Sequence, residues 1–212
     1  MKSYVTEFIG TFFLVLTIGL TVLGGTPLAP LAIGCSLMIM VYMGGHISGA
    51  NYNPAVTLAL VMRGKLASKE LVPYIVSQLL GAIAAAWIVL VLTGRTFAPE
   101  PSTTATTTQA LLTEVLYTFA LALVVLNTAT HPLTKGNSFY GLAIGFTIVV
   151  AAFAGGPISG GAFNPAVGIG LVVVNALLGG GTWGSLWLYL VGPFLGGALA
   201  AMVFRMQEDV PS

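Results

Sequence analysis

Two asparagines, Asn53 and Asn164, occupy matching positions of a stretch that occurs twice in the chain. The first copy reads GGHISGANYNPAV at 44–56 and the second reads GGPISGGAFNPAV at 155–167, with nine of thirteen positions identical. Asn followed by Pro favours the N-cap and first position of a helix. A helix N-terminus carries about half a positive charge, and each Asn side chain adds N–H donors. Two such ends facing each other would attract neutral polar molecules and repel cations. The six residues of the two motifs are Asn53, Pro54, Ala55, Asn164, Pro165 and Ala166.

Little else in the chain suggests bond-breaking chemistry. No metal-ligand spacing, nucleophile with a base or phosphate-binding loop occurs, so we expect no enzymatic activity, no metal and no cofactor. Only 6% of residues are charged and the net charge is +1, which gives no basic cluster for nucleic acid. The single cysteine, Cys35, excludes an internal disulfide.

The composition predicts an integral membrane protein. The chain has 212 residues and is 57% hydrophobic, and a bilayer-spanning helix needs about 20 apolar residues. Six runs are long enough: 4–24, 29–48, 71–93, 110–130, 138–156 and 184–205. The stretches 54–62 and 165–175 follow the two asparagines and are too short to cross. The sequence therefore predicts six spans and two half-helices.

The basic residues predict the orientation of the spans. With the N-terminus in the cytoplasm, six basic residues fall on the cytoplasmic side: Lys2, Arg63, Lys65, Lys69, Lys135 and Arg205. Only Arg95 falls outside. Cytoplasmic loops carry an excess of Lys and Arg, so both termini are expected in the cytoplasm. The Thr-rich stretch 99–109 is then an external loop, expected to be flexible.

The repeat extends beyond the asparagine motifs. Glu7 and Glu114 are related by an offset of 107, and YIVSQLLGAIAAA (74–86) matches YLVGPFLGGALAA (189–201) at an offset of 115. The single domain, 1–212, is therefore interpreted as two repeats, about 1–94 and 109–206. Each repeat holds three spans, an odd number, so the second enters the membrane inverted. Inverted repeats with broken helices place their site near the midplane.

The segments before the two motifs, GGHISGANY and GGPISGGAF, are expected to be extended and buried or pore-lining, because non-helical backbone is tolerated at membrane depth only there. Their carbonyls would form a ladder of acceptors for a polar solute. The residues expected to supply these carbonyls are Gly49, Ala50, Asn51, Gly160, Gly161 and Ala162. A water held by both asparagines would interrupt a proton wire.

The chain resembles the aquaporins, of the major intrinsic protein family, over nearly its whole length. The resemblance lies in EFIGTFFLV, HISGANYNPAVTLAL, TEVLYTFALALVV, FNPAVGIG and WLYLVGPFLGGALAA. It implies a homotetramer with a pore in each subunit, and glutamates at the positions of Glu7 and Glu114 that anchor the loops. A buried carboxylate can instead serve as a proton relay. His46 is interpreted as a satisfied loop histidine near the cytoplasmic mouth, and His131 as solvated.

The resemblance also implies a second constriction on the outer side, at Ile33, Ala152, Gly161 and Val167. Water-selective members usually have an aromatic residue, often His, and Arg at the first, second and fourth positions, and this chain has none of them. The ring is therefore expected to be wide, apolar and uncharged. Val at the fourth position resembles some tonoplast intrinsic proteins and some bacterial metalloid-linked channels. Asn51 also replaces a usual His.

We therefore predict a passive channel in the plasma or bacterial inner membrane for water and small uncharged solutes. Glycerol, urea, ammonia, peroxide and metalloid acids are candidate solutes. One alternative is a proton-coupled secondary transporter that uses Glu7 and Glu114, and another is a closed-pore junction protein. If the channel excludes glycerol and urea, the loop at 95–109 is the first candidate to close the outer vestibule.

Overall fold

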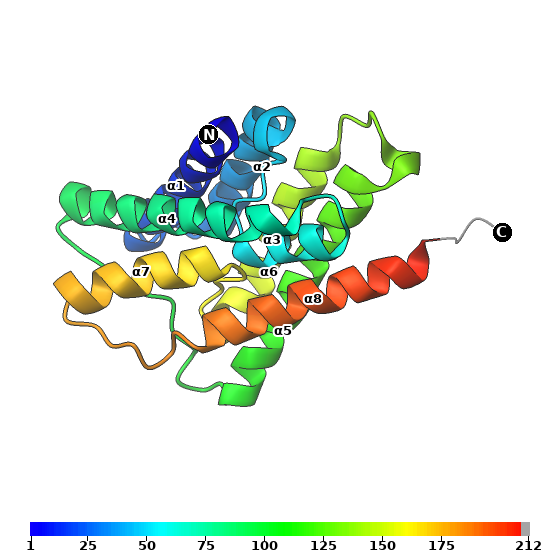
Figure 1. The fold of residues 1–212 in the computed structure, drawn as a ribbon. Coiled ribbons are helices and arrows are strands. Elements are labelled where there is room, and N and C mark those ends of the chain that lie inside the picture. Colours follow the sequence, from blue (N-terminus) through cyan, green and yellow to red (C-terminus); the bar gives the residue numbers. More distant parts are fainter. Residues whose placement is uncertain (209–212) are drawn as a thin grey trace.

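The computed structural model describes residues 1–208 and forms a bundle of eight α-helices within them (Figure 1). Six are long and apolar enough to cross a membrane: α1 (Lys2–Leu23), α2 (Ala29–Ser48), α4 (Leu71–Thr93), α5 (Thr107–Val125), α6 (Tyr140–Ser159) and α8 (Leu188–Gln207). The other two, α3 (Pro54–Met62) and α7 (Pro165–Leu178), begin at the proline after each asparagine. The predicted six spans and two half-helices are confirmed.

The two segments before the asparagine motifs differ from the expectation of extended chain, although α2 ends at Ser48 as the predicted span 29–48 does. GGHIS and GGPIS are not extended chain, because they form the last turns of α2 and α6. His46 accordingly lies in a helix and not in a loop. The helices stop only at Gly49 and Gly160, which adopt left-handed φ values of 86° and 89°. Glycine adopts this conformation without steric cost, and it commonly ends helices.

The two halves of the chain pack in the same way. Helix α1 packs on α4 and α2, and α5 packs correspondingly on α8 and α6. The half-helices cross over, since α3 packs on α8 and α7 packs on α4. Figure 1 shows α3 and α7 among the long helices with their N-terminal ends turned toward the middle of the bundle.

Glycines allow the long helices to approach closely. A Cβ added to Gly81 would lie 2.4 Å from the carbonyl oxygen of Phe8, where α4 crosses α1. A Cβ added to Gly196 would lie 2.4 Å from the carbonyl oxygen of Val115, where α8 crosses α5. Small residues at such crossings are typical of helices that associate within a membrane. The same crossing is thus built in both halves.

Side-chain bonds tie together the helix ends at each end of the bundle. At one end, the Tyr4 hydroxyl donates to Glu70 at 2.7 Å, and Arg63 forms an ion pair with Glu208. At the other end, Arg95 donates to the carbonyl oxygen of Leu23 at 2.6 Å. Arg95 therefore lies at the end opposite Arg63.

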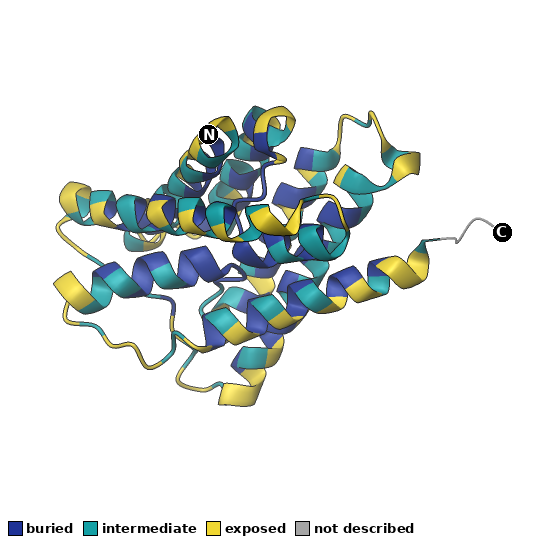
Figure 2. Cartoon of the chain, in the orientation of Figure 1, coloured by how far each residue is buried: buried dark blue, intermediate teal, exposed yellow. Residues whose placement is uncertain are grey.

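Burial follows the pattern expected of a bundle in lipid. In Figure 2 the dark blue residues gather where helices face one another, and exposed residues follow the outward faces and the ends. Many outward residues are large and apolar, among them Leu92, Leu116 and Val150. Water would not favour such a surface, whereas a bilayer does.

The stretch 99–109, expected to be a flexible external loop, makes hydrogen bonds within the bundle, and its last three residues belong to α5. The amide of Ser102 donates to the carbonyl oxygen of Ile158 at 3.0 Å. Thr106 and Gln109 form a capping box that begins α5, which satisfies free backbone donors at the helix start.

Candidate functional site

The two asparagines join the halves of the chain at the middle of the bundle. The Oδ1 atoms of Asn53 and Asn164 accept from the amides of Ala55 and Ala166, both at 2.9 Å, and so cap α3 and α7. The Nδ2 atom of Asn53 donates to the carbonyl oxygen of Phe163 at 2.9 Å, and that of Asn164 donates to Tyr52 at 2.8 Å. The expectation left both amide groups free for a solute. Each asparagine NH2 group instead donates one hydrogen to a carbonyl oxygen of the opposite half, which leaves its second hydrogen available to a solute.

The two short loops that precede the asparagines have a strained backbone. Among residues 1–208 the non-glycine residues with positive φ are Ala50, Tyr52 and Phe163, at 50°, 51° and 49°. All three belong to these loops. Such conformations cost about 1–3 kcal/mol each and persist only where the surroundings impose them. Something must therefore hold the loops in place.

The buried glutamates hold these loops. Glu7 is 0% exposed and accepts four hydrogen bonds. Its donors are the Ser48 hydroxyl at 2.7 Å, the Asn51 amide at 2.9 Å, the Tyr52 amide at 2.7 Å and the Gln78 side chain at 2.8 Å. A carboxylate offers about four acceptor positions. Every one is occupied by a protein donor, which favours the anchoring role over the proton relay.

Glu114 repeats this arrangement with three donors. The Ser159 hydroxyl, the Ala162 amide and the Phe163 amide approach its oxygens at 2.7, 3.0 and 2.7 Å. The fourth donor is missing because Pro193 occupies the position that matches Gln78. The two anchors are therefore equivalent in place but unequal in strength.

A polar network that the sequence did not predict extends the first anchor toward Asn51. The Thr57 hydroxyl donates to the carbonyl oxygen of Asn53 at 2.9 Å, so it can only accept from other groups. It accepts from Gln78 at 2.9 Å and from Asn51 Nδ2 at 3.3 Å. This fixes both amide orientations and leaves Asn51 Oδ1 without a donor among the described residues. The repeat gave no signal for this network, because Gly168 matches Thr57.

Two cavities meet at the asparagine loops. The first has a volume of about 440 Å³ and is lined mainly by apolar side chains, with both asparagines in its wall. The second has a volume of about 980 Å³ and lies at the end of the bundle that carries His46, Lys65, His131 and Lys135. Residues that line both cavities are Ala50, Asn51, Val125 and Ile144. The cavities thus adjoin, one on each side of the loops.

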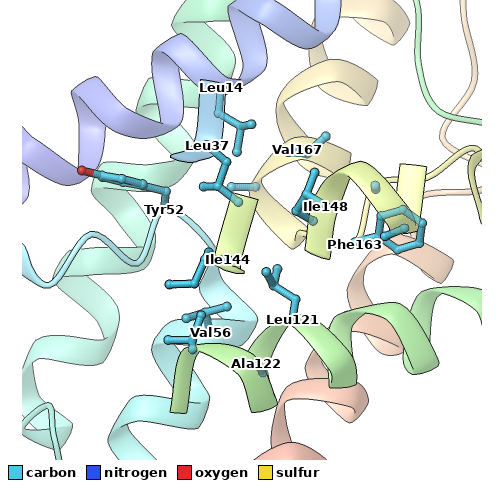
Figure 3. Close-up of a cluster of buried hydrophobic side chains, with 14 of the residues drawn as sticks. Leu14, Leu37, Tyr52, Val56, Leu121, Ala122, Ile144, Ile148, Phe163 and Val167 are labelled. Atoms are coloured by element: carbon cyan, nitrogen blue, oxygen red, sulfur yellow. The ribbon is translucent and has the colours of Figure 1, made fainter. Parts of the chain in front are cut away.

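Figure 3 shows how the apolar wall of the first cavity is assembled. Leu14, Leu37, Leu121 and Ile148 come from four different helices, and Val167 comes from the first turn of α7. All five line the first cavity. No single helix defines the passage, so its width depends on how the bundle packs.

The structure brings the four predicted filter positions into this same cavity. Ile33, Ala152, Gly161 and Val167 all line it, and Val167 is buried. Of the predicted carbonyl residues, Ala50, Asn51, Gly160, Gly161 and Ala162 line the first cavity, while Gly49 lines the second. Pro54, Ala55, Pro165 and Ala166 are buried and line neither cavity. The one charged side chain in the described wall of the first cavity is Glu100.

Loop residues that the sequence reasoning did not single out also belong to this wall. Phe97, Ala98, Pro99 and Glu100 line the first cavity together with the filter positions. The only sequence signal was the length of the loop. His131, expected to be solvated, is half-buried and packs edge-on against Phe204, with ring centres 6.0 Å apart.

Comparison with known proteins identifies the class to which this fold and cavity belong. Residues 1–204 match the major intrinsic protein family. The chain is 34% identical to "Aquaporin NIP1-1" of Zea mays over 97% of its length and 74% of that protein. It is 36% identical to "Probable aquaporin TIP2-2" of Oryza sativa subsp. japonica, over 97% of this chain and 86% of that one.

Two further likenesses come from a bacterium and a parasite. The chain is 33% identical to "Glycerol uptake facilitator protein-like 6" of Lactiplantibacillus plantarum, over 97% of its length and 98% of that protein. Its fold matches the X-ray structure of the aquaglyceroporin from Plasmodium falciparum with a TM-score of 0.83, at 24% identity, covering 97% of this chain and 96% of that one.

The chain therefore belongs to the major intrinsic protein family. It is an integral membrane protein and a passive channel for water and small uncharged solutes, and it is not an enzyme. The comparisons give no support to the alternative of a proton-coupled transporter.

Proposed function

We propose that the channel conducts glycerol and urea as well as water. The observation that carries this proposal is the set of four filter positions in the first cavity, Ile33, Ala152, Gly161 and Val167. An arginine would bring five donors and a permanent charge into this ring. Small apolar residues leave it wider and uncharged, so it selects water poorly. The likeness to a glycerol uptake facilitator supports the same solute class.

We also propose that the asparagine pair is the barrier to ions, with Glu7 and Glu114 as its anchors. The positive ends of α3 and α7 meet at Asn53 and Asn164, where they repel cations. The remaining hydrogen of each Nδ2 donates to a passing solute, and carbonyls of 49–51 and 160–162 accept from it. The bonds from each asparagine to the opposite half keep the two positive ends together.

The proposed membrane topology places both termini in the cytoplasm, with 1–94 and 109–206 as inverted repeats. Its support is the basic residues at one end of the bundle and Arg95 at the other. The second cavity then opens to the cytoplasm and the first to the outside. We propose a homotetramer in the plasma or bacterial inner membrane. The family resemblance supports that assembly, and cross-linking of the purified channel would test it.

Stopped-flow measurements on proteoliposomes test the solute range. The wild type is expected to pass water, urea and glycerol, with glycerol flux that does not saturate. Val167→Arg should lower glycerol flux more than water flux, because the ring gains a bulky charged donor. Val167→Arg combined with Ala152→His should strengthen this effect by filling the facing space. A wild type that passes water but excludes both larger solutes would contradict the proposal.

A further inference from the structure

One wall of the first cavity contains an aromatic side chain, Phe97, that does not belong to the four filter positions. Phe97 lies between α4 and α5 in the sequence, yet it lines this cavity together with Ile33 and Val167. Its side chain is half-buried and packs against the apolar core of the bundle. None of the four filter positions is aromatic in this chain. The loop therefore contributes the bulky aromatic side chain, Phe97, to this part of the cavity wall.

Hydrogen bonds hold the loop on both sides of Phe97. The neighbouring Thr96 hydroxyl donates to Asn175 Oδ1 at 2.8 Å, near the end of α7. Farther along, the Ser102 amide donates to the carbonyl oxygen of Ile158 at 3.0 Å, at the end of α6. The loop is therefore tied to α6 and α7, the two helices that carry the filter positions Ala152 and Val167.

The segment between these ties is close to Gly160 and has a restricted backbone. A Cβ added to Gly160 would lie 2.6 Å from the amide nitrogen of Glu100 and 2.7 Å from its carbonyl oxygen. Pro99 and Pro101 fix their own φ angles and restrict the residues before them to extended conformations. The backbone is therefore restricted over 98–101, directly after Phe97, and the residue before Phe97 is tied to α7 by its side chain.

We propose that Phe97 forms a fifth wall of the outer constriction and sets the largest solute that passes. This inference rests on the proposed function, because it assumes that solutes pass the ring at Ile33, Ala152, Gly161 and Val167. The ring of Phe97 narrows the passage without adding donors or charge. Neutral solutes are therefore selected here by their cross-section, so that unbranched molecules pass more readily than bulkier, branched ones.

The test compares water, urea, glycerol and the branched tetrol pentaerythritol in proteoliposomes. Phe97→Ala is expected to raise the ratio of glycerol to water permeability by about tenfold, comparable to the discrimination that small changes of space give in an apolar pocket. It should also admit pentaerythritol. Thr96→Val, which removes the tie to Asn175, should shift the ratio in the same direction by a smaller factor. Phe97→Leu provides a milder change of volume if the alanine variant fails to fold.

Phe153→Ala is the matched control. Phe153 is 50% exposed and follows the filter position Ala152 on α6, but it does not line the first cavity. Its variant should retain wild-type permeability ratios. Unchanged ratios in both Phe97 variants would overturn the inference even if the wild type passes glycerol. A wild type that excludes glycerol, with a Phe97→Ala variant that passes it, would instead support the fifth wall and contradict the proposed solute range.

Discussion

At the scale of single residues, the buried carboxylates of Glu7 and Glu114 differ in the number of hydrogen bonds that a substitution would remove. Both oxygens of Glu7 accept two donors each, whereas one oxygen of Glu114 accepts only the Phe163 amide. Glutamine keeps one acceptor oxygen and turns an NH2 group toward the other donors. Glu7→Gln should therefore lose two bonds to a charged group, about 3 kcal/mol or more.

Glu114→Gln should be the milder change, because its amide opposes one donor instead of two. Thermal unfolding of each purified variant in detergent, compared with Glu7→Ala and Glu114→Ala, measures the difference. Both glutamine variants should exceed their alanine counterparts in stability and keep water flux. A glutamine variant that folds with wild-type stability but passes no water would argue for a protonation role.

Thr57 and Thr118 provide a second contrast between single residues. Both are 0% exposed, but the Thr57 hydroxyl makes three hydrogen bonds and the Thr118 hydroxyl makes none among the described residues. Thr57→Val strands donors of Asn51 and Gln78, which should cost about 1–3 kcal/mol. Thr118→Val removes a buried unpaired hydroxyl and should be neutral or stabilising. If thermal unfolding showed the same loss of stability in both variants, the hydrogen-bond network around Thr57 would contribute nothing to stability.

At the scale of elements, the loop before Asn53 packs closely against a glycine of α1. A Cβ added to Gly10 on α1 would lie 2.1 Å from the ring of Tyr52. The Tyr52 amide is one of the groups held by Glu7, so Gly10→Ala should displace the loop and reduce the yield of folded channel. Gly156→Ala is the control, because its Cβ would meet nothing within 4 Å. Size-exclusion chromatography after expression measures the yield of folded channel for both variants. Equal yields would contradict the requirement for a glycine at position 10.

The elements themselves could be predicted from the sequence, and some of their ends could not. Hydropathy reveals a span, and an asparagine before proline reveals a helix start, because both effects are local. The predicted span 29–48 ends where α2 ends, but the predicted end of α6 at 156 was too early, and GGHIS and GGPIS were wrongly expected to be extended. The glycines in these segments suggested loops, yet the helices continue to Gly49 and Gly160. Residues from the repeat, such as Glu7 and Asn53, were found by their second copy. Gln78 and Phe97 were missed because their roles depend on tertiary contacts without such a copy.

At the scale of the whole molecule, the two halves are joined at the asparagine pair, which is the ion barrier in the proposed function. Each asparagine caps its own half-helix and donates to the opposite loop, at 2.9 Å from Asn53 and 2.8 Å from Asn164. Aspartate at either position would keep the cap but lose the donor. It would also bring a negative charge to the positive helix ends and face the carbonyl oxygen of the other half. The proposed ion barrier and the hydrogen bonds between the two halves would therefore be weakened together.

Asn53→Asp and Asn164→Asp should therefore raise cation conductance above the wild-type level, because the added carboxylate cancels the positive potential of the helix ends. Electrical recording on planar bilayers measures the conductance, and water flux in vesicles shows that the pore is intact. Asn175→Asp is the control. Asn175 lies near the other end of α7, outside both described cavity walls, and its Oδ1 accepts from Thr96, a bond that aspartate retains. Unchanged conductance in variants that still pass water would mean that the barrier to cations lies elsewhere in the channel.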